Sequence, residues 1–462
     1  MRERALISLA ALALLGACAA GPDVRNVALP AVSSAIQNMV YRTPGPLITR
    51  TKADGSTNPN FPSGKVVVLP FETPDYPRNP AITSAAIFDE FFANGVLTGV
   101  TIANYFLENS YNQFLVKNGG IANTVTLSKN LLGSSNAYVG FEGDDQVPRD
   151  VLKQANINWA SLDTNNDHVI TPAEAQLVFL VANGFSAATR GFVSYPTGNI
   201  NNPVPLSSLA NVPTPSGTYT FLPKVVYIGT KRANDPTYAT DPFRITSSIC
   251  HELGHAFFNL PDRYLNFCGT GRTGQYDMMS NNCSWEHFTL HDKVKIGWIK
   301  PQILQGHLSQ CLAFPASEST PAALAIVPPS ASQTPSGEYW LIENRYKPAS
   351  GCNGCLLFTP ANGVFDTGLP ESGLAVWWVR TNALGGGQDD VRLVSALNHG
   401  ADPDGTTPIT GADPGFINQG AGALFKVDTA SPNKILADST GGWSLLWFTA
   451  VSNPAGTVFA QF

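Results

Sequence analysis

The feature that most constrains this 462-residue chain is a pair of histidines four residues apart, with a glutamate directly after the first. These residues are His251, Glu252 and His255, in the run His-Glu-Leu-Gly-His. On a helix, side chains at positions i and i+4 project from one face, so both imidazoles can bind one Zn²⁺. The glutamate can then reach a water on the metal and act as a general base. We therefore predict a helix at about 245–258 that carries two zinc ligands and a base.

A catalytic zinc site takes a third protein ligand and leaves a fourth position open. One candidate is Asp262, seven residues after His255. Pro261 ends the helix, and Asn259 tolerates the left-handed conformation that a chain reversal requires, so the chain can double back toward the metal. The other candidate is Glu286, which would place the third ligand on a later helix. The sequence leaves both open.

A second histidine pair, His287 and His291, also has i,i+4 spacing. It lacks a glutamate at the catalytic position, which favours a packed or exposed helix face over a second metal site. We expect the helix that carries this pair at Glu286–Ile296.

The segment 163–174 has the twelve-residue spacing of an EF-hand calcium loop. Helices at 151–155 and 172–181 would flank it, and His168 stands at the sixth position, where glycine usually provides the backbone bend. We predict a structural Ca²⁺ site, and the alternative is a solvated acidic loop. The oxygen ligands would come from Asp163, Asn165, Asp167, the Val169 carbonyl, Thr171 and Glu174.

The first 18 residues have the pattern of a secretory signal peptide, with two arginines, an apolar stretch and a small-residue end. The run Leu-Gly-Ala-Cys that ends at Cys18 resembles the bacterial lipobox, and ordinary cleavage nearby is the alternative. We expect an exported protein, either lipid-anchored to the bacterial cell envelope through Cys18 or secreted, with no other membrane attachment. Six further cysteines, an even number, favour disulfides in an oxidising compartment.

Composition narrows the class of protein further. The formal net charge of −6 argues against a nucleic-acid partner, which would require a basic surface. With 43% hydrophobic and 13% charged residues the chain is too apolar to be disordered, and its 41 glycines and 35 prolines predict many turns. Apolar runs predict a buried strand at 65–70 and short C-terminal strands such as 339–343 and 374–379.

Several motifs, in one consistent order, resemble a known family. The segment 251–264, His-Glu-Leu-Gly-His-Ala-Phe-Phe-Asn-Leu-Pro-Asp-Arg-Tyr, is similar to the signature of the immune inhibitor A family of secreted bacterial metallopeptidases, within the metzincins. The segment 276–280, Tyr-Asp-Met-Met-Ser, resembles that family's Met-turn, in which Met279 matches the turn methionine and Met278 is the fallback. The resemblance covers roughly 65–380, with further matching segments at 100–114, 292–298, 338–345 and 365–374.

The resemblance implies an α/β (α+β) metzincin-like zinc peptidase domain over 65–300 and a β-rich C-terminal part over 301–462. The segment 19–64 would be a linker or pro-segment. The implied protein is an exported zinc-dependent endopeptidase, a monomer, that hydrolyses protein or peptide substrates. The implied roles are zinc ligation by His251, His255 and Asp262, general base catalysis by Glu252, and support of the metal site by Met279.

The sequence departs from the family signature at one place. Phe258 stands where the signature has glycine, three residues after the second histidine, and the spacing to Asp262 is one residue longer. An alternative function is therefore a non-catalytic surface lipoprotein that keeps a structural zinc site and binds a protein or glycan through its β-rich part. The intact Glu252 favours the enzyme, because a structural site has no use for a general base.

Overall fold

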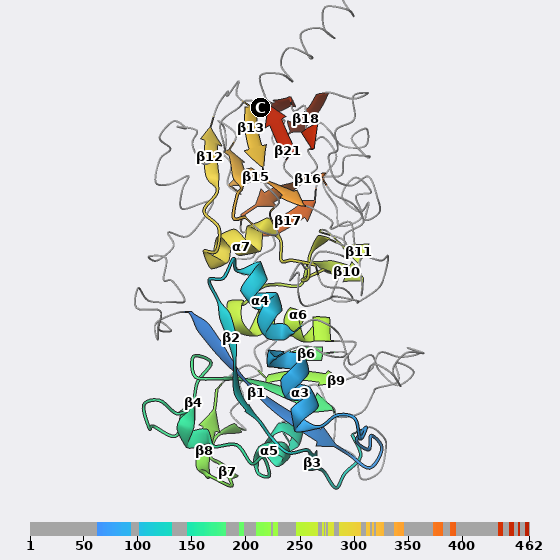
Figure 1. The fold of residues 1–462 in the computed structure, drawn as a ribbon, viewed down its shortest axis with the longest axis vertical. Helices are drawn as coiled ribbons and strands as arrows, with labels where there is room; N and C mark the ends of the chain where they lie inside the picture. The colour runs from blue at the N-terminus through green and yellow to red at the C-terminus, as the bar shows by residue number, and fades with distance from the viewer. Residues whose placement is uncertain are drawn as a thin grey trace, which may run out of the picture.

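The computed structural model (Figure 1) describes a defined set of segments, and every structural statement below concerns these residues. The signal peptide, Cys18 and most of the predicted linker lie outside them, so the predictions made there are not addressed by the structure. The described segments are 62–93, 101–131, 146–181, 194–197, 209–222, 225–229, 246–266, 270–271, 273, 276–280, 286–305, 311–314, 317, 320–327, 337–345, 373–381, 389–393, 433–437, 443–447, 451–452 and 458–461.

The first half of the chain forms a mixed sheet with strand order β2-β1-β5-β9-β6, and β3 also pairs with β1. β1 runs parallel to β2, β3 and β5, and β5 runs parallel to β9. Only the edge strand β6 is antiparallel to its neighbour in this sheet. The strands are β1 (Ser63–Glu72), β2 (Leu115–Ile121), β3 (Val125–Thr126), β5 (Gln176–Val181), β6 (Ser194–Thr197) and β9 (Val225–Gly229).

Both faces of this sheet are covered, which explains why β1 is apolar almost throughout rather than alternating. Val66 and Val68 join the core formed with α3 (Ser84–Phe92), α4 (Ile102–Asn109) and α6 (Thr246–Phe258). Val67 and Leu69 point the other way, into the core that includes α5 (Gln146–Leu152). Short elements that complete this half are η2 (Trp159–Ser161), β4 (Val169–Ile170), β7 (Val212–Thr214) and β8 (Gly217–Phe221).

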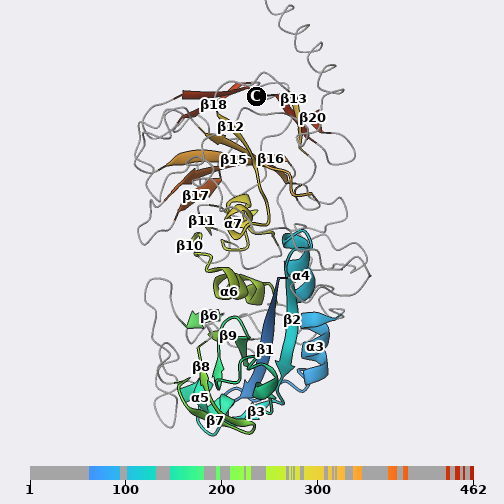
Figure 2. The ribbon, with the colours of Figure 1, turned by 90° about the vertical axis from the view of Figure 1, so that its left-hand side faces the viewer.

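A second sheet, with order β12-β14-β15-β16-β17, follows α7 (Leu290–Ile296). One of its faces packs on α7 and contributes Tyr339, Leu341 and Trp377 to a third core. In Figures 1 and 2, α6 and α7 lie between the first sheet at one end of the molecule and the C-terminal strands at the other. The strands of the second sheet are β12 (Gln302–Gln305), β14 (Leu324–Val327), β15 (Glu338–Arg345), β16 (Gly373–Arg380) and β17 (Asp390–Leu393).

The remaining short strands form three small sheets or hairpins. Among the described residues, no helix is both long and apolar enough to cross a membrane. These strands are β10 (Tyr264–Asn266), β11 (Thr270–Gly271), β13 (Cys311–Phe314), β18 (Asn433–Ala437), β19 (Trp443–Trp447), β20 (Val451–Ser452) and β21 (Val458–Gln461).

Two sequence-based element predictions are wrong. The expected helix at 172–181 is instead the central strand β5, because its run Gln-Leu-Val-Phe-Leu-Val is buried on both sides between β1 and β9. The helix expected from Glu286 begins only at Leu290, because the Thr289 hydroxyl accepts a hydrogen bond from the Asp292 N–H and caps the first turn. The segment 286–289 is therefore not helical, and it is hydrogen-bonded to Tyr105 and Asn109 of α4.

Among the described residues, one of the six further cysteines is shown not to be in a disulfide. Cys250, on α6 beside the first histidine, is a buried free thiol, and burial raises its pKa. Four of the other five, Cys268, Cys283, Cys352 and Cys355, lie outside the described residues.

Candidate metal centre

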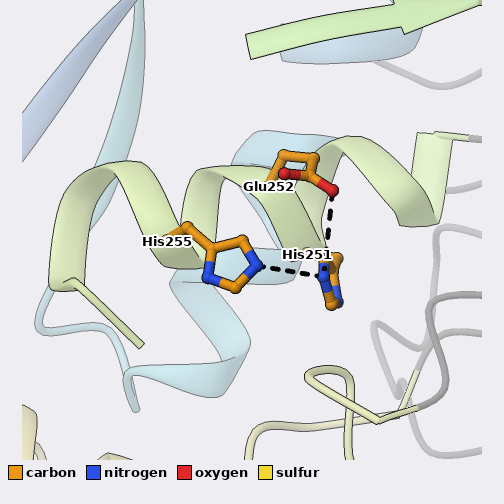
Figure 3. A group of neighbouring side chains, drawn as sticks. All are labelled: His251, Glu252 and His255. Carbon is orange, nitrogen blue, oxygen red and sulfur yellow. Dashed lines mark hydrogen bonds and ion pairs between the residues drawn. The ribbon is translucent and has the colours of Figure 1, made fainter. Parts of the chain in front are cut away.

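The two histidines of the predicted motif lie on α6, turned toward each other as Figure 3 shows. Both are almost fully buried. His251 Nδ1 donates to the Met278 carbonyl at 2.9 Å, and His255 Nδ1 donates to the Leu260 carbonyl. In each bond the proton stays on Nδ1 and points at a backbone carbonyl oxygen. Each Nε2 then faces the other histidine and is available to bind a metal.

The third candidate ligand, Asp262, completes a triangle with these two nitrogen atoms. The two Nε2 atoms of His251 and His255 lie 3.1 Å apart, and Asp262 Oδ1 lies 3.1 Å from the first and 3.2 Å from the second. Tetrahedral ligands held about 2.0 Å from a zinc ion lie roughly 3.3 Å from one another. The three atoms therefore fit one zinc ion without rearrangement. The Asp262 side chain is 48% exposed, which leaves the site open toward solvent.

The turn after α6 explains how Asp262 reaches this position. The helix ends at Phe258, and Asn259 has φ 58°, the left-handed conformation predicted for it. Its N–H still donates to the His255 carbonyl at 3.0 Å. The family signature has its glycine three residues after the second histidine, whereas here the left-handed residue comes fourth. In both, the aspartate follows three residues later, so the two departures from the signature are a single shift of the turn.

Phe258, which occupies the glycine position of the signature, has a packing role. Its ring lies 4.9 Å from the Phe114 ring and 5.0 Å from the Trp298 ring, centroid to centroid, in edge-on contacts. Such aromatic pairs stabilise beyond simple burial, by about 0.5–1.5 kcal/mol each. The last turn of α6 is therefore held against the core that α3, α4 and α6 share.

The predicted Met-turn lies directly under α6. A Cβ on Gly254 would come within 3.0 Å of Met279 Sδ and 3.1 Å of the Phe288 ring, so any larger residue would require these side chains to shift. Met279 is fully buried, and its carbonyl accepts from the Arg263 N–H at 2.9 Å. Met279 is thus the methionine beneath the helix, while Met278 supplies the carbonyl that orients the first histidine.

Glu252 lies beside the triangle rather than within it. Its carboxylate is buried, and Oε1 lies 3.8 Å from His251 Nε2, further than the Asp262 oxygen. The ligand atoms of His251, Glu252 and His255 also lie within 4.8 Å of one another. A carboxylate at this distance is close enough to act on a water held at the open position.

The electrostatics of the site favour a positive charge between these side chains. Burial lowers the pKa of His251, but its hydrogen bond to Asp262 and the charges of Glu252 and Asp262 outweigh burial and raise the pKa to about 9. Burial likewise raises the pKa of Asp262, but hydrogen bonds to the two histidines hold it well below its usual range. The donor set is therefore suited to a cation, and these residues fit a zinc ion.

The rival ligand and the second histidine pair lie elsewhere. Glu286 is fully buried, and its carbonyl accepts from the Tyr105 hydroxyl on α4 at 2.8 Å. His287 precedes α7 and contacts Glu108 Oε1 through Nε2 at 3.0 Å. His291 is on the helix and also buried. The two histidines are thus packed, as predicted, but do not share one helix face.

The predicted calcium loop folds around its first and last carboxylates. Asp163 accepts from the N–H groups of Asp167 at 3.2 Å and His168 at 2.9 Å. His168 has φ 60°, so it adopts the left-handed conformation that glycine usually provides at this position. Glu174 accepts from both the N–H and the hydroxyl of Thr164 and Thr171. The four remaining predicted ligands, Asn165, Asp167, Val169 and Thr171, lie along the same turn.

Sequence reasoning missed a buried ion-pair network beside the site. Arg263, directly after the third candidate ligand, donates through Nε to Asp292 at 3.2 Å and through Nη2 to the same carboxylate. Asp277 of the Met-turn lies 3.8 Å from Arg263 Nε; burial, together with repulsion from Asp292, raises the Asp277 pKa to about 6. No local pattern announces this network, because its members are far apart in the sequence.

Comparison with known proteins adds no relative. No family model and no curated protein sequence matches this chain.

Proposed function

We propose that this protein is a zinc-dependent endopeptidase that hydrolyses protein or peptide substrates, with Glu252 as general base. The observation that carries the proposal is the triangle of His251 Nε2, His255 Nε2 and Asp262 Oδ1, with sides of 3.1–3.2 Å, beside a buried glutamate. The motif resemblance to the immune inhibitor A family supports the same function. Export, the lipid anchor at Cys18 and the monomeric state stay predictions.

In this mechanism each residue has a distinct task. His251, His255 and Asp262 would hold the metal, and zinc in such a site supplies Lewis acidity toward a carbonyl oxygen and toward water. The Glu252 carboxylate accepts a proton from the attacking water and delivers it to the nitrogen of the leaving amine. The carbonyls of Met278 and Leu260 keep both imidazoles in the tautomer that the metal needs.

The alternative, a binding protein with a structural zinc, loses its main support. It rested on Phe258 and the longer spacing, which the position of Asn259 explains as a shifted turn that still brings Asp262 to the histidines. The glycan-binding version rested on the β-rich composition and the aromatic residues of the C-terminal part. Trp377 and Trp378 are buried in the second sheet, which favours a core role for them.

The test is casein cleavage by the full exported chain before and after chelation. We expect 1,10-phenanthroline followed by dialysis to abolish cleavage, and one equivalent of Zn²⁺ to restore it, because the ligands hold the only Lewis acid that the mechanism uses. Bound zinc, measured by elemental analysis, should fall and return in parallel. Cleavage that survives complete zinc removal would contradict the proposal.

We also propose that the loop 163–174 binds a structural Ca²⁺. At one hundred times its Kd, calcium should add about 2.7 kcal/mol to the free energy of unfolding, because it binds only the folded loop. The expected result is a calcium-dependent rise in Tm that Glu174→Gln abolishes, measured by calorimetry. Asp150→Asn, which removes an exposed carboxylate paired with Lys153 on α5, is the matched control and should keep the rise. An equal rise in the Glu174→Gln variant would exclude this site.

A further inference from the structure

Arg263, the residue that follows the third candidate ligand, is held by hydrogen bonds from both its backbone and its side chain. The Arg263 backbone N–H donates to the Met279 carbonyl at 2.9 Å, and its side chain is only 4% exposed. The guanidinium makes two parallel contacts with Asp292 on α7, through Nε at 3.2 Å and through Nη2. Planar two-point contacts of this kind fix direction as well as distance. Asp262 itself is half-exposed, so this buried neighbour ties the backbone of the ligand to the protein interior.

The anchor continues into the second sheet. Arg263 Nη2 also lies 3.2 Å from His291 Nδ1, and His291 Nε2 donates to Asp389 Oδ2 at 2.9 Å. Asp389 directly precedes β17, the edge strand of the second sheet, and Lys295 Nζ lies 3.5 Å from the same carboxylate. A continuous buried chain of polar contacts therefore runs from the metal-site turn through α7 to a strand more than a hundred residues further along the sequence.

The second sheet also reaches the Met-turn by a separate route. Arg345, at the end of β15, is fully buried and donates through Nη1 to the Tyr276 carbonyl at 3.0 Å. Its partner Glu343 accepts from the Trp377 indole N–H at 2.8 Å, which holds both side chains against β16. Tyr276 is the first residue of the Met-turn. Further along this turn, the Met278 carbonyl orients the first histidine and the Met279 carbonyl accepts from the Arg263 N–H.

We propose that Arg263 is a positioning residue for the metal ligand Asp262, and that Asp389 of the C-terminal sheet completes its support. The metal site then extends across both sheets instead of being contained in 65–300. This inference rests on the metal centre proposed above. Ordinary packing between the two halves would affect stability alone, whereas a positioning role must also change how tightly the metal is held.

The test compares two arginine-to-lysine changes. Arg263→Lys keeps the charge but loses the planar two-point contact. Arg392→Lys does the same to an equally buried arginine, whose guanidinium donates to Asp390 of β17 through Nε and Nη2. We expect Arg263→Lys to weaken zinc binding by about 10-fold, the lower end of the range for loss of a ligand's hydrogen-bond partner, because Arg263 holds the chain next to Asp262 rather than its carboxylate. Arg392→Lys should leave the zinc Kd unchanged.

Zinc affinity is measured by competition with a chelating indicator, and the visible spectrum of the Co²⁺-loaded protein reports ligand geometry independently of activity. Arg263→Lys should change that spectrum, and Arg392→Lys should not. Asp389→Asn, at the far end of the chain of contacts, should weaken zinc binding in the same direction, and it decides the matter if Arg263→Lys does not fold. Wild-type zinc affinity and cobalt spectrum in Arg263→Lys, or in Asp389→Asn in that case, would overturn this inference alone. Failure of the wild-type protein to bind zinc would overturn the metal centre and this inference with it.

Discussion

Glu252→Ala should abolish peptide hydrolysis while the protein keeps its zinc. The carboxylate lies 3.8 Å from His251 Nε2, beside the ligand triangle, so its removal leaves the three metal-binding atoms in place. Loss of a positioned general base typically costs a factor of about 10²–10⁴ in rate. We expect casein cleavage to fall by at least this range, with the zinc content measured on the same sample.

A matched control for this variant is Glu90→Gln, which changes a buried glutamate on α3 instead of one on the metal-binding helix. It should keep both zinc and cleavage. Two results would argue against the assigned role of Glu252. Its alanine variant could retain more than a tenth of wild-type activity, or it could lose zinc together with activity, which would make Glu252 a ligand instead.

Asp262→Ala should cause the largest loss of metal affinity of any single carboxylate substitution in the described chain. Its Oδ1 lies within 3.2 Å of both histidine Nε2 atoms, whereas the rival ligand Glu286 is buried in the segment held by α4. We expect zinc Kd to rise by more than the roughly 10–100-fold typical of outer-shell partners. Because the Asp262 side chain is 48% exposed, its replacement leaves no buried cavity.

The companion variant for this prediction is Glu286→Gln, assayed in the same competition titration with a zinc indicator. It should bind zinc as the wild-type protein does. The opposite pattern, with zinc lost in Glu286→Gln and kept in Asp262→Ala, would assign the third ligand to the later glutamate and would require the segment before α7 to rearrange.

Much of the site could be predicted because its chemistry is local. The i,i+4 spacing places two histidines on one helix face, and Asn259 adopts the left-handed conformation expected of it. The strands around 65–70, 339–343 and 374–379 were also predictable, since continuous apolar runs bounded by turn residues mark buried strands. These features depend on neighbours within a few residues.

Where sequence reasoning failed, distant partners decided the structure. The run at 176–181 has no periodicity that separates a buried strand from a buried helix, and only its pairing with β1 and β9 makes it a strand. The same holds for Arg263 and Asp389, whose connection through His291 spans both sheets. No residue near Asp389 in the sequence signals that it supports a metal ligand.

The position of Asn259 bears on how metal sites of this kind are recognised in other sequences. A search pattern that counts from the second histidine to the third ligand treats this chain as a mismatch twice, at Phe258 and at Asp262. A pattern that starts from the residue with positive φ, either glycine or asparagine, and places the third ligand three residues later would accept this chain. Sequences now rejected for an extra residue in this helix could then be tested for the same triangle of ligands.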